Sequence, residues 1–133
     1  MRLLLDTHVL LWALMARRRL PKRLLATLAD PDHDVLFSAI NIWEIAIKRA
    51  RGRPSFTFGP TDVLDAALDA GFVELPVKAV HAARSGELPP LHADPFDRLL
   101  VAQALCEPAR LVTADVAIQR YPAPIEFFTP LAD

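Results

Sequence analysis

The sequence predicts an α/β fold, a three-layer sandwich in which helices cover both faces of a mainly parallel, five-stranded sheet. Short apolar runs that are typical of buried strands alternate along the chain with longer helical patterns. The length of 133 residues, with 53% hydrophobic and 23% charged residues, fits one folded domain over residues 1–133. This alternation favours parallel strands joined by right-handed crossovers, and such sheets bind ligands beyond the carboxyl ends of their strands.

Each predicted strand is a short apolar run bounded by polar or turn residues. The strands are expected at Arg2–Leu5, Val35–Phe37, Phe72–Leu75, Arg110–Val112 and Ile125–Phe128. Helices are expected between them at Thr7–Ala16, Pro21–Ala29, Asn41–Ala50, Pro60–Ala70, Val77–Arg84 and Pro95–Cys106, and a last short helix ends near Gln119. Asn41 is predicted to cap the third helix, with Glu44 as its capping-box partner.

The helix predicted at Pro95–Cys106 is apolar on almost every side, which indicates that it is buried nearly all round. Asp94 is predicted to be its N-cap, and Pro95 suits the first helical position because its missing N–H would have no partner there. Asp97 then lies in the first turn, at the edge of a core. A carboxylate in that position needs either the positive helix end or a counter-charge.

Composition and charge exclude several classes of protein. The one cysteine, Cys106, allows neither a disulfide framework nor a cysteine metal site within the chain. The apolar start of the chain, which ends at Asp6, is too short and too soon charged for a signal peptide. No apolar run could span a bilayer, so we expect a cytoplasmic protein without a membrane partner. The net charge of −1 argues against nucleic acid, yet neutralising four of the 16 acids would leave 12 against 15 bases, a balance of +3.

Four acids each follow a predicted strand or begin a predicted helix: Asp6, Glu44, Asp97 and Asp115. Because the carboxyl ends of parallel strands share one edge, we expect these side chains to lie together. Carboxylates brought close repel one another, and a divalent cation relieves that repulsion. Carboxylates without cysteine or histidine pairs favour Mg²⁺ or Mn²⁺ over zinc. The pattern therefore predicts a metal site.

Each of these acids also has a purely structural interpretation. Asp6 could cap the following helix, and Glu44 could be only a capping-box residue. Asp97 could simply interact with the positive end of its helix, and Asp115 could be a turn residue. Lys48 lies one helical turn after Glu44, where it could contact a phosphate or form an intrahelical ion pair. Both interpretations stay open at this point.

Four segments resemble the PIN-domain family, and more narrowly the VapC-type toxins of bacterial toxin–antitoxin pairs. They are Leu5-Asp6-Thr7-His8-Val9-Leu10-Leu11-Trp12, Trp43-Glu44-Ile45-Ala46-Ile47-Lys48, Asp94-Pro95-Phe96-Asp97-Arg98 and Val112-Thr113-Ala114-Asp115. The resemblance covers nearly the whole chain in order and spacing. Each motif alone is weak, but together they are specific. The resemblance implies a PIN-like sheet of Rossmann-like topology.

The resemblance also implies a Mg²⁺- or Mn²⁺-dependent ribonuclease that a cognate, VapB-like antitoxin holds inactive, and a homodimer. Carried over by position, the acidic quartet is Asp6, Glu44, Asp97 and Asp115. Thr7 and Thr113 match hydroxyl positions beside it, and Lys48 is a supporting residue. We expect hydrolysis of RNA phosphodiester bonds by metal-activated water.

Other interpretations of the sequence compete with this one. The chain could be a catalytically inactive PIN-like module that binds RNA or protein, although that would be expected to break the quartet. A haloacid-type phosphatase would need an aspartate two residues after Asp6, where His8 stands. His8 and His92 share no helical spacing and are left out of the predicted site. Arg98 is expected to make a structural pair more readily than a phosphate contact.

Overall fold

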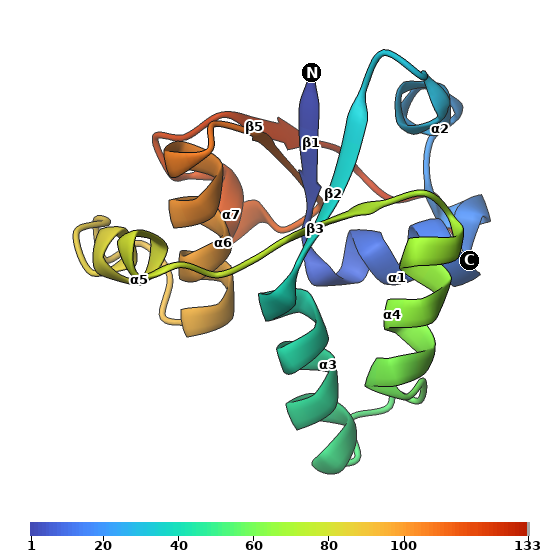
Figure 1. Ribbon diagram of the computed structural model, residues 1–133, viewed down its shortest axis with the longest axis horizontal. Coiled ribbons are helices and arrows are strands. Elements are labelled where there is room, and N and C mark those ends of the chain that lie inside the picture. Colours follow the sequence, from blue (N-terminus) through green and yellow to red (C-terminus); the bar gives the residue numbers. More distant parts are fainter. Residues whose placement is uncertain (133) are drawn as a thin grey trace.

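The structure is a computed structural model that describes residues 1–132, and it contains the predicted five-stranded sheet (Figure 1). The strands are β1 (Arg2–Leu5), β2 (Asp34–Ser38), β3 (Val73–Leu75), β4 (Arg110–Thr113) and β5 (Ile125–Phe127). All four strand pairings are parallel, so the predicted mainly parallel sheet is confirmed.

The strand order β3-β2-β1-β4-β5 places a topological switch point beside the central strand. The chain proceeds from β1 to β2 and β3 on one side, and then returns to place β4 and β5 on the other. Leu4 of β1 is therefore paired with Leu36 of β2 on one side and with Leu111 of β4 on the other. Crossovers that diverge from one point leave a crevice at the carboxyl ends of β1 and β4.

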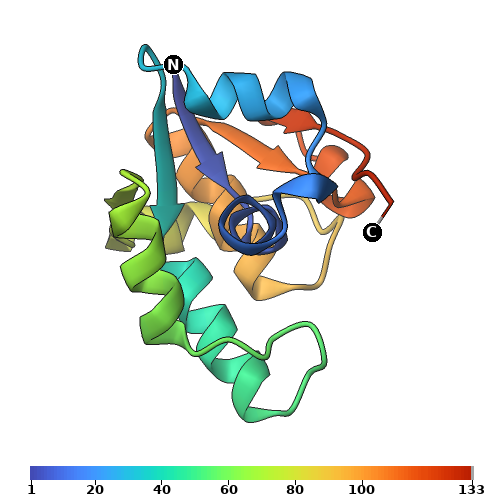
Figure 2. The ribbon, with the colours of Figure 1, turned by 90° about the vertical axis from the view of Figure 1, so that its right-hand side faces the viewer.

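Helices cover both faces of the sheet, as predicted (Figures 1 and 2). They are α1 (Thr7–Met15), α2 (Lys22–Ala29), α3 (Ala39–Ala50), α4 (Pro60–Asp69), α5 (Ala79–Ser85), α6 (Pro95–Cys106) and α7 (Val116–Gln119), with a 3₁₀ turn at Arg17–Arg19. Alternate residues of a strand point to opposite faces. Leu3 and Leu5 accordingly belong to the core under α1, α2 and α4, whereas Leu4 belongs to the core under α6 and α7.

The start of α3 corrects one prediction. The N-cap is Ser38, whose hydroxyl accepts a hydrogen bond from the Ile40 N–H at 3.0 Å. Asn41 stands three residues later, and its amide oxygen accepts from the Ser38 N–H at 2.7 Å. The prediction that Asn41 is the cap and Glu44 its partner is therefore wrong, because the serine that ends β2 caps the helix at once. Glu44 takes no part in capping this helix.

Helix α6 agrees with its prediction. Asp94 is the N-cap, and its carboxylate accepts from the backbone N–H groups of Phe96 at 2.8 Å and Asp97 at 3.3 Å. The segment 100–104 is fully buried, so the helix is anchored in the core. Gln103 in this segment donates from its amide nitrogen to the Pro76 carbonyl at 3.3 Å. The acidic first turn of α6 is thus held rigidly at the edge of the sheet.

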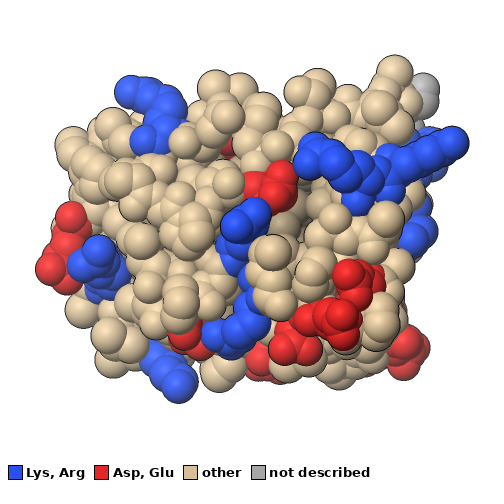
Figure 3. Space-filling view, turned by 90° about the horizontal axis from the view of Figure 1, so that it is seen from above, with Lys and Arg blue, Asp and Glu red and all other residues tan. Residues whose placement is uncertain are grey.

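Charged side chains are mixed on the face that lies above the amino-terminal ends of the strands. Figure 3 shows this face from above, with small groups of acidic and basic side chains separated by uncharged surface. No helix within residues 1–132 combines the length and the apolar composition that crossing a membrane requires.

Arg98 fixes the loop that leads into α6, a structural role that its prediction favoured. Its guanidinium donates to the carbonyls of Ser85 at 2.8 Å, Pro89 at 3.1 Å and Leu88 at 3.3 Å. It also donates to the Tyr121 hydroxyl at 3.3 Å. These bonds join the loop to α6, and the same loop carries His92.

We expect Arg98→Ala to lower the free energy of unfolding by about 1–3 kcal/mol, because several partly buried carbonyls would lose a charged donor. Urea-induced unfolding would measure the loss. Arg84→Ala is the matched control, since Arg84 is an exposed arginine on α5. A loss no larger for Arg98→Ala than for this control would contradict the role given to Arg98.

Candidate active site

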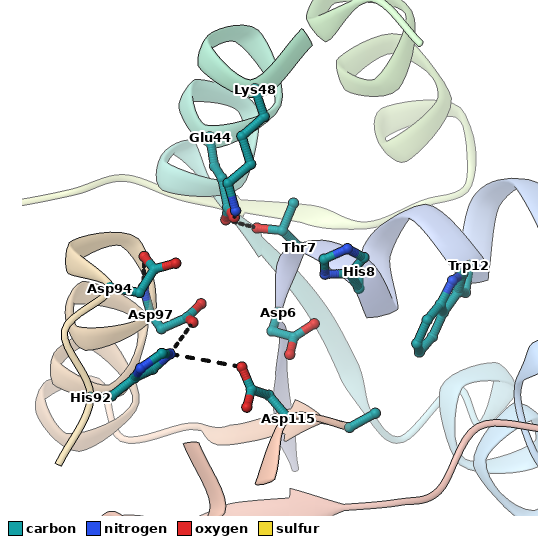
Figure 4. A pocket seen from close by; sticks show the side chains of 11 residues that line it. Asp6, Thr7, His8, Trp12, Glu44, Lys48, His92, Asp94, Asp97 and Asp115 are labelled. Carbon is teal, nitrogen blue, oxygen red and sulfur yellow. Dashed lines mark hydrogen bonds and ion pairs between the residues drawn. The ribbon is translucent and has the colours of Figure 1, made fainter. Parts of the chain in front are cut away.

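A cavity of about 400 Å³ opens at the carboxyl ends of β1 and β4, where the switch point predicts a ligand site (Figure 4). All four predicted acids line it, together with Thr7 and Lys48. Thr113, the remaining predicted residue, is fully buried and contacts one of these acids. The structure thus brings together side chains from α1, α3, α6 and the segment after β4.

Asp6 leads from β1 into α1 and is nearly buried, with 6% exposure. One carboxylate oxygen accepts from the Val9 N–H at 3.0 Å, which makes Asp6 the N-cap of α1. The other oxygen accepts from the Thr113 hydroxyl. Even with these donors, burial raises the pKa of the Asp6 carboxyl above its usual value. The capping interpretation is correct for Asp6, and its carboxylate still faces the cavity.

Glu44 is held by a chain of polar contacts and is only 2% exposed. Thr7 donates its hydroxyl hydrogen to Glu44 Oε1 at 2.5 Å, and the Asn41 amide donates to the Thr7 oxygen at 3.0 Å. Glu44 Oε2 accepts from the Lys48 ammonium, one helical turn along α3. The ion pair considered for Lys48 is therefore present, and it neutralises one of the four acids.

Asp97 projects from the first turn of α6 toward Asp6 and Asp115 (Figure 4). Burial, followed by the neighbouring charge of Asp94, raises the pKa of the Asp97 carboxyl to about 7. Asp115 caps α7 by accepting from the Ala117 N–H at 2.8 Å, and its side chain keeps 42% exposure. Asp115 is thus both a cap and an open carboxylate at the rim of the cavity.

His92 belongs to the cavity, although the sequence interpretation omitted it. Its Nε2 lies 2.8 Å from Asp97 Oδ2 and 3.8 Å from Asp115 Oδ2. Helical spacing could not reveal this, because His92 lies in the loop before α6. Its only sequence signal was nearness to the Asp94 cap. His8 lines the cavity as well, and its ring packs edge-on against Phe56 with centroids 5.4 Å apart.

One group of donor atoms is already close enough to share an ion. Within residues 1–132, His92, Asp94 and Asp97 are the only three such side chains whose ligand atoms all lie within 4.8 Å of one another. Asp6, Glu44 and Asp115 line the same cavity but lie outside this closest group. The four acids of the quartet therefore line one cavity, but only Asp97 belongs to the most closely spaced group of ligand atoms.

The family of the chain follows from a comparison of its sequence with family models. The model described as PIN domain matches residues 3–124, nearly the whole chain. The chain belongs to the PIN domain family. A search of curated proteins finds no match to this PIN domain. Membership supports a nuclease role, because the same cavity carries the acids that the family resemblance assigns.

Solved structures share the fold of this PIN domain. A chain in the crystal structure of VapBC2 from Rickettsia felis, bound to a DNA fragment from their promoter, is 20% identical, with a TM-score of 0.72 and coverage of 96% of this chain and 99% of that one. A chain in the structure of DNA-bound VapBC from Salmonella typhimurium is 15% identical, with a TM-score of 0.67 and coverage of 96% of this chain and 98% of that one. A chain in the structure of VapBC-5 from Mycobacterium tuberculosis is 18% identical, with a TM-score of 0.61 and coverage of 96% of this chain and 98% of that one. At these identities the likeness establishes the PIN-like fold alone.

The donor set in this PIN domain fits a hard divalent cation. Five carboxylates line the cavity, the four of the quartet and that of Asp94, and Lys48 is the one lysine or arginine among the described residues that line it. Burial and mutual repulsion raise the pKa values of the Asp6 and Asp97 carboxyls, so negative charge in the cavity is incompletely compensated. Carboxylate oxygens are the ligands that Mg²⁺ and Mn²⁺ favour, and His92 adds a nitrogen that Mn²⁺ tolerates better than Mg²⁺.

Proposed function

We propose that this chain is a metal-dependent ribonuclease, which hydrolyses RNA phosphodiester bonds and acts as the toxin of a toxin–antitoxin pair. The observation that carries the proposal is the convergence of four carboxylates in one cavity from four separate segments of the chain (Figure 4). Glu44 and Asp97 are not helix caps, so capping does not explain why these two acids face the cavity. Asp6 and Asp115 cap helices and also face that space.

Asp6 and Asp97 are the residues that would hold Mg²⁺ or Mn²⁺ directly. Glu44 and Asp115 would contribute through water or hold a second ion. A divalent ion bound there lowers the pKa of a water molecule and neutralises negative charge on the phosphodiester. The ligands proposed here stand on four different elements, so the site exists only in the folded chain.

The neighbouring hydroxyls preorganise these acids. The Thr113 hydroxyl and the Val9 N–H fix both oxygens of Asp6. Thr7 orients Glu44, and Asn41 in turn orients Thr7. Because Asp6 and Glu44 are each held in one geometry, ordering these two acids costs little when an ion or a substrate binds. Lys48 limits the repulsion between Glu44 and an incoming phosphate.

The toxin role adds a protein partner to the nuclease role. Its support is the shared fold with chains of VapBC complexes, together with an open acidic cavity that an arginine from an antitoxin tail could enter. Trp43 is 57% exposed beside an apolar groove on α3 and α4, and exposed apolar surface is typical of protein contacts. We also propose that the chain forms a homodimer in the cytoplasm.

The direct test is incubation of the purified chain with single-stranded RNA and either Mg²⁺ or Mn²⁺. We expect cleavage that EDTA abolishes, and no cleavage of DNA of the same sequence. Binding of RNA without cleavage in either metal would favour the inactive, RNA-binding alternative. Separately, co-expression with the protein encoded beside this chain should give a stable complex, and failure to bind that protein would contradict the toxin role alone.

A further inference from the structure

A second cavity, of about 440 Å³, adjoins the acidic cavity and has a different character. Lys48 and Asp94 line both, so the two spaces are neighbours. Arg51, Arg53 and Phe96 also line the second cavity. We call this second cavity the basic groove. It begins at the end of α3 and passes along the first turn of α6.

Arg51 and Arg53 give the basic groove its positive charge. Both are exposed, and neither guanidinium has an ion-pair or hydrogen-bond partner within residues 1–132. Gly52 between them adopts a φ of +70°, which suits a glycine after a helix end, and the Arg53 N–H returns to the Lys48 carbonyl at 3.1 Å. This turn sets the backbone at both arginines, which line the groove.

A cation at a helix C-terminus is often no more than a favourable helix-end charge. That explanation can account for Arg51, which is the C-cap of α3. It does not account for Arg53, which lies beyond the helix and lines the same groove. Arg51 and Arg53 thus place two unpaired positive charges beside an acidic cavity. They suit a polyanion that must approach repelling carboxylates.

Phe96 supplies an aromatic surface opposite the arginines. It is half-buried in the first turn of α6 and directly precedes Asp97. The Trp43 ring packs against it edge-on, with centroids 5.2 Å apart and planes at 77°. The Lys48 ammonium lies 5.9 Å from the Phe96 centroid. The ring is therefore held in place, and an unpaired base could stack on it.

We propose that the basic groove binds the single-stranded segment of the RNA next to the phosphodiester that is cut. Arg51 and Arg53 contact two backbone phosphates, and Phe96 stacks on one base. This inference rests on the proposed ribonuclease function and assigns a substrate-binding surface to it. Stacking on an aromatic side chain requires an unpaired base, because a duplex keeps the faces of its bases covered.

The test is the binding of a fluorescent, single-stranded RNA of about 12 nucleotides to the full chain in EDTA, where no cleavage is expected. Fluorescence anisotropy would give the affinity at several salt concentrations. Each phosphate contact on a single strand contributes about 0.7 to the slope of log K against log salt concentration. The double variant Arg51→Gln/Arg53→Gln should therefore reduce that slope by about 1.4.

The matched control removes two cations outside both cavities, Lys22→Gln/Arg84→Gln, and should leave the slope unchanged. Phe96→Leu keeps an apolar side chain but removes the aromatic face. It should weaken binding about tenfold without changing the slope, because base stacking is independent of salt. Equal slopes for the groove variant and the control, or no RNA binding by the wild type, would overturn the proposal.

Cleavage assays separate this inference from the proposed function. Binding with the expected slopes but no cleavage in Mg²⁺ or Mn²⁺ would support the groove and contradict the nuclease. Cleavage by groove variants that also bind RNA as the wild type does would contradict the groove alone. Loss of the protein partner by the double variant, with RNA binding unchanged, would assign the groove to that protein and overturn the proposal.

Discussion

Asp97→Asn is expected to reduce metal-dependent RNA cleavage at least about a hundredfold, because it removes a direct ligand and a negative charge from the proposed metal site. The fold should remain. The capping of α6 depends on Asp94, and an asparagine has nearly the same size as the aspartate it replaces. The rate of cleavage of a labelled RNA in Mn²⁺, with circular dichroism to check the fold, measures this effect.

Stability gives an internal control for this variant. Burial and the Asp94 charge raise the pKa of the Asp97 carboxyl to about 7, so its charged form is unfavourable in the metal-free protein. A neutral amide relieves that cost, and the variant should unfold no more readily than the wild type. Full activity in Asp97→Asn would refute the assignment of Asp97 as a ligand.

Asp6→Ala is expected to abolish toxicity in cells. Induced expression of the wild-type chain alone should arrest growth, because an unrestrained ribonuclease destroys essential RNA. The variant should permit growth at the rate of an uninduced culture. Growth curves after induction, with equal protein amounts verified by immunoblot, measure the difference. Equal growth arrest by both proteins would contradict the catalytic account.

Asp6→Ala also removes the N-cap of α1, which costs about 0.5–2 kcal/mol. Asp6→Asn is therefore the necessary companion. Its side-chain oxygen can still accept from the Val9 N–H, since asparagine caps helices as well as aspartate does. Relief of growth arrest by both variants would attribute the effect to the lost carboxylate. Relief by the alanine variant alone would attribute it to a weakened fold.

The pattern of hydrophobic residues along the chain was sufficient to predict the architecture. Leu3, Leu4 and Leu5 are all buried because a central parallel strand is covered on both faces, and the unbroken apolar run records that. The start of α3 was less predictable. Ser38 and Asn41 are both good capping residues, and the sequence does not state at which residue the strand turns into the helix. The geometry of the turn decides in favour of Ser38.

The placement of the acids in one cavity could be predicted from topology, since Asp6 and Asp115 each follow a strand of the same sheet. Their roles as ligands remain predictions. His92 could not be found in this way, because no periodic pattern connects a loop residue to a site. Its position depends on tertiary contacts. One is the bond from the Tyr121 hydroxyl to the His92 carbonyl at 3.4 Å, and another is the anchoring of the loop by Arg98.

The central claim is that the four carboxylates form a divalent-metal site, and thermal unfolding in the presence of Mn²⁺ tests it most directly. At a hundredfold excess of Mn²⁺ over its dissociation constant, binding adds about 2.7 kcal/mol of stability, or about 10 °C in Tm for a chain of this size. We predict such a rise for the wild type and almost none for Asp97→Asn. No rise in the wild type, or an equal rise in both proteins, would contradict the account.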